Sequence, residues 1–276
     1  MAKHRSLQKS TFKLHVKSEK RDSIDKSKQL TKRPYPPCTQ EISMKPNCTN
    51  PEWVGRAKCA VCEVRNFVLF SGLTTHELDS ILQPVDNLHA QQHAVLYEKG
   101  TVAPSVYTVR SGLIKLKIDL PNGGQRIVRL LRQGDVAGME TLLGERYHHT
   151  AIALQDSDVC RIPREVLMRL DQTNPSVHQA LLQRWQRSVD QADHFIVALS
   201  TGPAEARMAR LLITLGCIGD HPETLPSRED MGALLGITTE TASRIMAEFK
   251  RRGLVHANRG SEVVCDQRGL TQLAGQ

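Results

Sequence analysis

Hydrophobic positions divide this 276-residue chain into a polar N-terminal stretch, a middle part of short apolar runs and a C-terminal part with helical periodicity. Residues 1 to about 50 contain few large apolar side chains and include the turn-prone run PYPP at 34–37. Such a composition cannot bury enough apolar surface to form a core. We therefore expect a solvated, disordered arm followed by folded domains that start near Cys59.

Short apolar runs alternate with turn signals between residues 90 and 163. Many short strands at close spacing favour an antiparallel sandwich or roll. Turns are expected at 99–100, 111–112, 121–124 and 134–135, where glycine recurs. The predicted strands are 93–97, 106–110, 113–118, 126–131, 149–154 and 159–162.

Two helical patterns follow, a short one at 163–173 and a long one at about 176–199. In the long helix, apolar side chains recur at spacings of three and four residues, which is a heptad-like seam. The seam could pack on the chain's own β-roll, but we favour a dimer interface. The seam residues are Leu181, Trp185, Val189, Ala192, Ile196 and Leu199.

Residues 227–253 have the pattern of two helices joined by a tight turn. Ser227 is a suitable N-cap for the first helix, and Thr238 can cap the second. Gly236 interrupts the apolar run between them, as the corner of a helix-turn-helix requires. An amphipathic helical hairpin inside an enzyme would give a similar spacing.

The second of these helices carries two different faces. Its buried stripe is expected to hold Ile245, Met246 and Phe249, while its other face presents polar side chains at i, i+3 and i+4. Arg can grip guanine in a major groove, Glu can accept from cytosine, and Ser is adaptable. The candidate base-reading residues are Glu240, Ser243 and Arg244, and the candidate phosphate contacts that follow are Lys250, Arg251 and Arg252.

Net charge does not by itself indicate nucleic acid binding. The formal charge is +8, but residues 1–50 contain 12 Lys and Arg against 4 Asp and Glu, which accounts for all of it. DNA binding therefore depends on local placement in the C-terminal part. The basic arm could add weak, non-specific attraction to DNA. The chain has no apolar run long enough to span a membrane and no secretory signal, so we expect a cytoplasmic protein.

The run ITTETASRIMAEFKRRGLV at 237–255 resembles the recognition-helix signature of the Crp/Fnr transcription factors, in the form associated with the Fnr branch. The glycines at 112, 124, 134 and 138 resemble the β-roll sensor domain of the same family. The resemblance implies an α+β chain with an N-terminal β-roll (a cyclic-nucleotide-binding-like jelly roll), a long dimerisation helix and a C-terminal winged helix-turn-helix. The corresponding segments are a basic arm at 1–58, a sensor domain at 59–173, a dimerisation helix at 174–202 and a DNA-binding domain at 203–276.

The resemblance also implies partners: a second copy of the chain in a homodimer, a palindromic operator DNA and RNA polymerase. Residues 254–266 would form the wing, with its turn near 258–261 and Arg259 close to phosphate. Thr238 joins the operator-facing set at the start of the recognition helix.

Cyclic nucleotide binding is not expected. Members of the family that bind cyclic AMP hold its phosphate with a Gly-Glu pair and an Arg-Ser pair. Gly138 and Glu140 keep the first pair, whereas the positions matching the second are Tyr147 and His148. Without that Arg, a buried phosphate lacks a bidentate partner.

Seven cysteines in a chain without a secretory signal suggest thiols or metal ligands before disulfides. Oxygen-sensing members of the Fnr branch hold a 4Fe–4S cluster with three N-terminal cysteines and one from the β-roll. By this resemblance Cys59 and Cys62 match the first two N-terminal ligands and Cys160 matches the β-roll ligand, but the third N-terminal position is Val68. Of the two cysteines further upstream, Cys48 lies nearer than Cys38 and could replace the missing ligand. The resemblance therefore implies the ligand set Cys48, Cys59, Cys62 and Cys160.

Several alternatives stay open at the level of sequence. They are zinc bound by cysteines, a haem-bound gas, a small-molecule signal, a thiol redox switch, and loss of any cofactor. A rival of another class is a cytosolic redox enzyme using Cys59 and Cys62. No nucleophile–base pair, phosphate loop or grouped carboxylates support catalysis, so we expect a regulator and not an enzyme.

Overall fold

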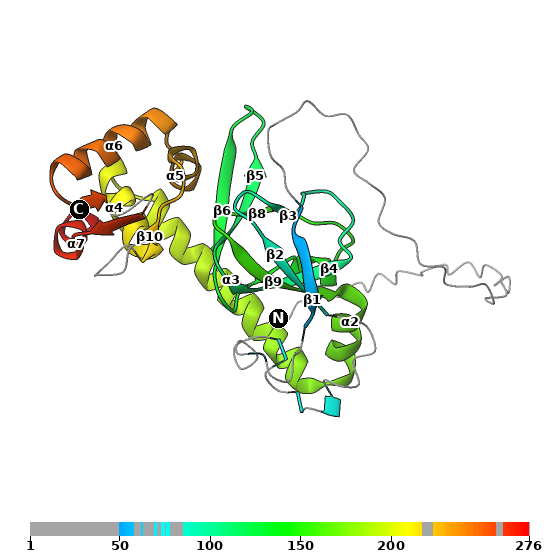
Figure 1. Cartoon of the computed structure of the whole chain (residues 1–276). Helices are drawn as coiled ribbons and strands as arrows, with labels where there is room; N and C mark the ends of the chain where they lie inside the picture. The colour runs from blue at the N-terminus through cyan, green and yellow to red at the C-terminus, as the bar shows by residue number, and fades with distance from the viewer. Residues whose placement is uncertain are drawn as a thin grey trace, which may run out of the picture. The chain divides into compact units, whose positions relative to one another are not determined.

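The computed structural model describes residues 50–57, 62, 69–70, 73–74, 76–77, 85–216, 223–257 and 262–275 (Figure 1). Several expectations fall outside these residues: most of the basic arm, the ligand candidates Cys48 and Cys59, and the wing turn with Arg259.

Two antiparallel sheets form the N-terminal β-roll (Figure 1). The five-stranded sheet has the order β1 (Glu52–Arg56), β2 (Asp86–Ala90), β9 (Ser157–Pro163), β4 (Ser105–Ser111) and β7 (Val136–Ala137). The four-stranded sheet has the order β3 (Val95–Tyr97), β8 (Thr150–Ala153), β5 (Ile114–Asp119) and β6 (Gln125–Leu131). The expected antiparallel roll is confirmed, and each of the six predicted strands overlaps an observed one.

Alternation along β4 explains how one strand serves two cores. Tyr107 and Val109 point into the core between the two sheets. Val106 points to the opposite face, where it packs with residues of the two helices that follow the roll. Thr108 is two residues further along the same face and is also buried. The five-stranded sheet is thus covered on both sides.

One boundary in the sequence analysis was wrong. Strand β1 lies inside the stretch assigned to the disordered arm, and it pairs antiparallel with β2. Trp53 anchors it, because its indole Nε1 donates a hydrogen bond to Asp86 Oδ1 at 3.1 Å. The ordered sheet therefore begins at Glu52, before the cysteine pair.

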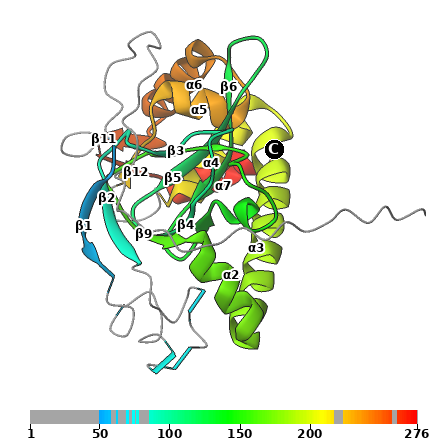
Figure 2. The same cartoon turned by 90° about the vertical axis from the view of Figure 1, so that its right-hand side faces the viewer.

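Two helices leave the roll, α2 (Arg164–Thr173) and α3 (Pro175–Ser200) (Figure 2). Asn174 caps α3, since its side chain accepts from the backbone N–H of Ser176 at 3.0 Å, and proline suits the first helical position. A short 3-10 helix, η3 (Met139–Leu142), lies between β7 and β8. No helix in the described residues is long and apolar enough to cross a membrane.

The C-terminal domain contains α4 (Ala204–Leu215), α5 (Arg228–Leu235), α6 (Thr239–Arg251) and α7 (Gln267–Ala274). Its small sheet has the order β10 (Glu223–Thr224), β12 (Glu262–Cys265) and β11 (Val255–Ala257). Helix α4 ends at Leu215 because Gly216 adopts a left-handed φ of 85°. Helix α7 was not predicted.

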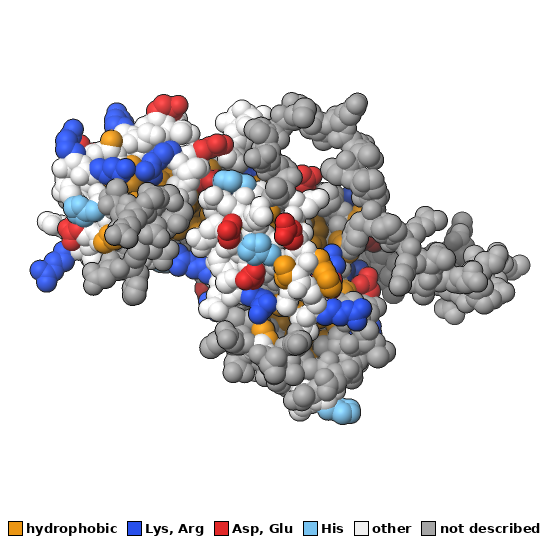
Figure 3. All heavy atoms as spheres, viewed as in Figure 1, with side chains coloured by type: hydrophobic (Ala, Val, Ile, Leu, Met, Phe, Trp, Pro, Cys, Tyr) orange, Lys and Arg blue, Asp and Glu red, His pale blue; other side chains and the backbone are white. Residues whose placement is uncertain are grey.

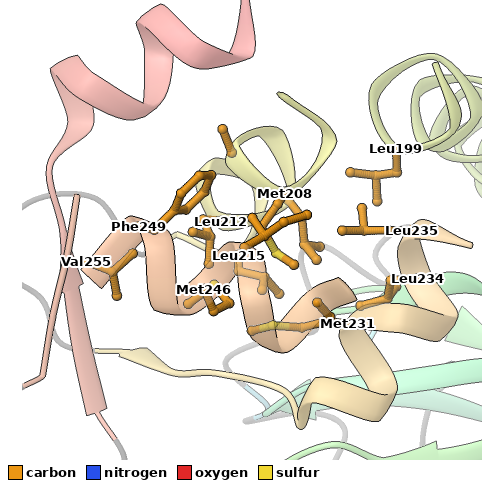
Figure 4. Packing of buried hydrophobic residues seen from close by; sticks show 14 of the residues in the cluster. Leu199, Met208, Leu212, Leu215, Met231, Leu234, Leu235, Met246, Phe249 and Val255 are labelled. Atoms are coloured by element: carbon orange, nitrogen blue, oxygen red, sulfur yellow. The ribbon is translucent and has the colours of Figure 1, made fainter. Parts of the chain in front are cut away.

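Three helices meet in the core of this domain (Figure 4). Met208 and Leu212 of α4 pack with Met231 of α5 and with Met246 and Phe249 of α6, all nearly or fully buried. Ile245, Met246 and Phe249 were the expected stripe of the second helix, and all three are buried. This packing fixes α6 so that its opposite face points outward.

Candidate nucleic-acid interface

The corner between α5 and α6 is built as its sequence predicts. Ser227 Oγ accepts from the backbone N–H of Asp230 at 3.0 Å, and Thr238 Oγ1 accepts from that of Thr241 at 3.2 Å. Gly236 has a φ of 65°, which places it in the left-handed region. The corner is tight, because a Cβ added at Gly232 would lie 2.8 Å from the carbonyl oxygen of Ile237.

The face of α6 opposite the core is exposed at every predicted base-reading position, namely Glu240, Ser243 and Arg244. Arg244 makes no hydrogen bond or ion pair with any described residue, so its guanidinium is available to a partner. Hydrogen bonds from its own backbone N–H and from Thr238 lower the pKa of the Glu240 carboxyl, which keeps it an acceptor.

The basic residues after the reading face differ in their surroundings (Figure 3 shows Lys and Arg side chains gathered on this domain). Arg251 pairs with Glu248, and Arg252 lies 3.8 Å from Glu205 of α4. Lys250 is exposed and has no such partner among the described side chains. Of the three predicted phosphate contacts, Lys250 is therefore the most available.

A hollow of about 550 Å³ lies between the start of α4 and α6. It is lined by Arg244 and Glu248 of α6, by Arg252 at the end of α6, and by Pro203 and Glu205 at the start of α4. The exposed reading face and the basic end of α6 thus border one concave surface.

In the β-roll, the region that resembles a cyclic-nucleotide site is occupied by the side chain of Tyr147. Tyr147, at the position of the family's Arg, turns inward and is only 3% exposed. Its ring stacks on Tyr97 with centroids 3.8 Å apart, and its hydroxyl donates to the carbonyl oxygen of Ser105 at 2.6 Å. Gly138 permits this, since a Cβ there would lie 3.0 Å from the tyrosine ring.

Glu140 remains beside this region but is occupied by local partners. The backbone N–H of His148 donates to Glu140 Oε1 at 3.2 Å, and His149 Nδ1 lies 3.6 Å from the same oxygen. Burial alone would raise the pKa of the Glu140 carboxyl, but His149 and the backbone N–H groups outweigh burial and lower that pKa. A hollow of about 450 Å³ opens here, lined by residues that include Arg129 and Trp185. The sequence analysis did not single out His149, because its contact with Glu140 depends on tertiary structure.

Among the predicted cluster ligands, only Cys62 and Cys160 fall within the described residues, and Cys160 is the buried one at 8% exposure. Cys160 lies on the outer face of the five-stranded sheet, in the same apolar cluster as Leu69 and Phe70. Its Sγ donates to Asn87 Oδ1 at 3.3 Å. The described residues contain no group of three or more potential metal ligands. Cys265 is buried in the small C-terminal sheet.

Comparisons with known proteins agree with both the β-roll and the helix-turn-helix domain. Residues 87–174 match the cyclic nucleotide-binding domain family, and residues 206–273 match the Crp-like helix-turn-helix domain family. The transcriptional regulatory protein btr of Bordetella pertussis is 27% identical over 80% of this chain and 94% of its own length. The fumarate and nitrate reduction regulatory protein of Shigella dysenteriae is 29% identical over 79% of this chain and 90% of its own. The chain belongs to the Crp/Fnr family.

Solved structures share the fold of this Crp/Fnr protein. A CRP-family transcriptional regulator from Thermus thermophilus matches with a TM-score of 0.61 at 23% identity, covering 68% of this chain and 96% of that one. FixK2 from Bradyrhizobium japonicum matches with a TM-score of 0.61 at 24% identity, with the same coverages. The protein is thus a DNA-binding transcription regulator and not an enzyme, since the relatives it matches are regulators.

Helix α3 of this Crp/Fnr regulator divides the predicted seam into two sets. Leu181 and Leu199 are buried against their own chain, and Trp185 packs on the cluster beneath the roll. Val189 and Ile196 are exposed at 51% and 58%, and Ala192 is partly buried. Leu182, which the sequence analysis did not choose, is 57% exposed and lies seven residues before Val189. Its spacing of seven from Val189, and of fourteen from Ile196, was the signal that could have revealed it.

Proposed function

We propose that this regulator reads a palindromic operator as a homodimer, contacts RNA polymerase there, and senses oxygen or redox state through an iron–sulfur cluster. The base-reading set would be Glu240, Ser243 and Arg244, with Thr238 at the start of α6. The exposed α6 face carries the operator part of this proposal, because it presents groups that hydrogen-bond to base edges in the major groove.

The dimer is supported by the apolar stripe on α3. Leu182, Val189 and Ile196 recur every seven residues and are each more than half exposed. A heptad stripe of this kind is suited to a parallel partner helix. A two-fold operator site then requires two copies of α6, one for each half-site.

The sensing part rests on the placement of Cys160. Leu69 and Phe70, which follow the Cys59–Cys62 pair by seven or more positions, pack on the same sheet face as Cys160. Leu69 and Phe70 therefore lie on the sheet face that carries Cys160, the ligand expected from the β-roll. Thiolates are the usual ligands of such clusters, and the donor set Cys48, Cys59, Cys62 and Cys160 supplies four.

The surroundings of Cys160 also suit a bound sulfur. Asn87 and Thr108 flank it on the neighbouring strands β2 and β4. Thr108 Oγ1 is buried with no hydrogen-bond partner among the described residues, so it could donate to a thiolate across the strand. When bound, the cluster would supply an oxygen-sensitive link between the N-terminal segment and the roll.

An absorption spectrum of protein purified under argon, with iron and sulfide assays, tests the sensing proposal. A broad brown shoulder with about four irons per chain is the expected result for a 4Fe–4S cluster. Protein with neither iron nor sulfide under these conditions would contradict the cluster. Exposure to air should then weaken binding to an operator selected with the anaerobic protein.

A second candidate is a small-molecule or haem-bound gas signal in the 450 Å³ hollow. The observation that favours it is the combination of Glu140, His149, Arg129 and Trp185 around one space. Haem would give a sharp Soret band in the same spectrum, and a colourless protein would leave a small molecule. Cyclic AMP is not proposed, because Tyr147 occupies the roll interior at the position of the phosphate-binding Arg.

A further inference from the structure

The hairpin of β5 and β6 contacts the first helix of the helix-turn-helix. Helix α5 lies beside β6 in both ribbon views (Figures 1 and 2). At the centre of this contact, Lys115 Nζ of β5 forms a close ion pair with Asp230 Oδ1 of α5. The two side chains are only 8% and 5% exposed. A buried ion pair between residues 115 positions apart joins the sensor domain directly to the DNA-binding domain.

Asp230 is held on its other side by its own helix. Ser227 Oγ donates to Asp230 Oδ2 at 2.9 Å, and the same hydroxyl accepts from the backbone N–H of Asp230 at 3.0 Å. The carboxylate is therefore fixed at the start of α5, and Lys115 meets it from the roll. Removing the lysine alone would leave this buried charge without its cation, which is a strongly unfavourable change.

Further contacts surround the pair. Arg126 of β6 donates through Nη1 to the carbonyl oxygen of Ala233 at 3.2 Å, and through Nη2 to Ser200 Oγ at 3.2 Å. Gln125 Nε2 donates to Glu229 Oε1 at 2.8 Å. Leu113 and Ile127 of the roll belong to the same apolar cluster as the core of the DNA-binding domain. The hairpin therefore contacts α5 through an ion pair, two further hydrogen bonds and apolar packing.

The covalent connection between the domains is exposed, although Arg210 of α4 donates to the carbonyl oxygens of Ala198 and Thr201 across it. Ser200, Thr201, Gly202 and Pro203 are all exposed, and Gly202 has a φ of 81°. Backbone dihedrals in such a linker can change at little cost. The hairpin contact therefore adds to Arg210 and to the packing of Leu199 in opposing rotation of α5 and α6 about this linker, and it is the contact that the β5–β6 hairpin supplies.

The contact leaves the reading face open, since Glu240, Ser243 and Arg244 remain exposed with α5 docked. We infer that Lys115 is a positioning residue for operator recognition: its ion pair with Asp230 fixes the orientation of the reading head relative to the dimer helix. Two heads fixed in this way meet two half-sites at one separation only. The inference rests on the proposed homodimer.

The test uses an operator selected in vitro with the wild-type protein, its single half-site, and variants with one or two base pairs added to or removed from the centre. Lys115→Met should lose tenfold or more in affinity for the intact operator, while half-site affinity changes by less than about twofold, because linkage of two heads depends on their geometry. Wild-type protein should bind one half-site spacing more tightly than the others, whereas Lys115→Met should bind all spacings with similar affinity. Lys115→Arg should restore the preference for one spacing.

Lys117→Met is the matched control, since Lys117 lies two residues along β5 and pairs with Asp119, which is 67% exposed. It should behave as wild type. Should Lys115→Met not fold, Arg126→Ala removes two hydrogen bonds without leaving a buried charge, and it should flatten the spacing preference in the same way.

Two results separate the inference from the proposed dimer. The first result concerns the Lys115→Met and Arg126→Ala variants, each as a dimer. If both keep the wild-type spacing preference, or lose half-site and full-operator affinity equally, the role of the hairpin is overturned while the dimer stands. The second result concerns the wild-type protein. If it binds its operator as a monomer in sedimentation, the proposed dimer is overturned, and so is the inferred role of Lys115 in setting the separation of two heads.

Discussion

Side chains on α6 differ in what they are free to do. Arg244 and Lys250 have no ion pair within the described residues, whereas Arg251 and Arg252 are each engaged with a glutamate. A residue that already has a partner must exchange it before it can contact phosphate, and the net gain is then small. The sequence identified all four as candidates, but it could not rank them, because Glu205 approaches Arg252 only through the packing of α4 on α6.

Replacing Arg244 with alanine tests base reading. Arg244→Ala should cost about 1–3 kcal/mol of specific binding and relax discrimination at one position in each half-site. Lys250→Ala should instead weaken binding to all sequences similarly and reduce the salt slope by about one. Binding assays on the selected operator and on single-base variants, across a salt series, separate the two. Equal loss of discrimination from both substitutions would contradict the assigned roles.

Gly236 combines two constraints at one residue. Its φ is 65°, and a Cβ there would lie 2.5 Å from Nη1 of Arg126. Gly236→Ala should destabilise the protein by about 1–2 kcal/mol from the backbone term, and by about 1 kcal/mol more as Arg126 is displaced from Ala233. Gly123→Ala is the control, since its φ is 81° and nothing lies within 4 Å. Urea unfolding should show the smaller loss for Gly123→Ala; equal losses would mean that Arg126 moves freely.

Elements with strong local signals were predictable. Alternating runs and glycine turns located six strands of the roll, and capping residues located α5 and α6. Strands β1, β2 and β7 were missed because β1 is an exposed edge strand, β2 reads DNLHA with three polar residues among its five, and β7 has only two residues. Periodicity alone also could not say which side of α3 faces its own roll, so Leu181 and Leu199 were grouped with side chains that point away.

The exposed apolar stripe of helix α3 leads to a testable prediction about the dimer. Ile196→Glu would place a charge in the proposed dimer contact with no evident partner, at a cost of several kcal/mol. Sedimentation should show a monomer, with loss of operator affinity. Gln183→Glu adds the same charge at an exposed position next to the stripe and should remain a dimer. A dimeric Ile196→Glu protein would show that the copies meet through another surface.

At the scale of the whole molecule, the two halves were predictable as a family pair, while their connection was not. The sequence places Lys115 in a strand and Asp230 in a helix, with nothing to relate them. Tyr147 is similar: its identity excludes the family's Arg, but its inward rotation onto Tyr97 depends on the space left by Gly138. Long-range contacts of this kind follow from packing, for which one sequence carries no periodic signal.

Cysteine substitutions test how the sensor half is completed. Because four thiolates are needed, loss of any true ligand should strip iron and sulfide from protein isolated under argon. The substitutions expected to do so are Cys48→Ser, Cys59→Ser, Cys62→Ser and Cys160→Ser. Those expected to leave the iron content unchanged are Cys38→Ser, Cys217→Ser and Cys265→Ser, the last two being in the DNA-binding domain.

Val68 supplies the sharpest form of this test. It stands six residues after Cys62, where oxygen-sensing relatives of the Fnr branch have their third N-terminal cysteine. If Cys48 replaces that missing thiolate by folding back across the ten residues before Cys59, the entropic cost of the loop is modest. Val68→Cys should then restore iron and sulfide to the Cys48→Ser protein, measured per chain under argon. A cluster that survives Cys48→Ser but is lost in Cys38→Ser would move the ligand upstream, and a Val68→Cys substitution that rescues neither variant would show that the segment after Cys62 does not reach the cluster.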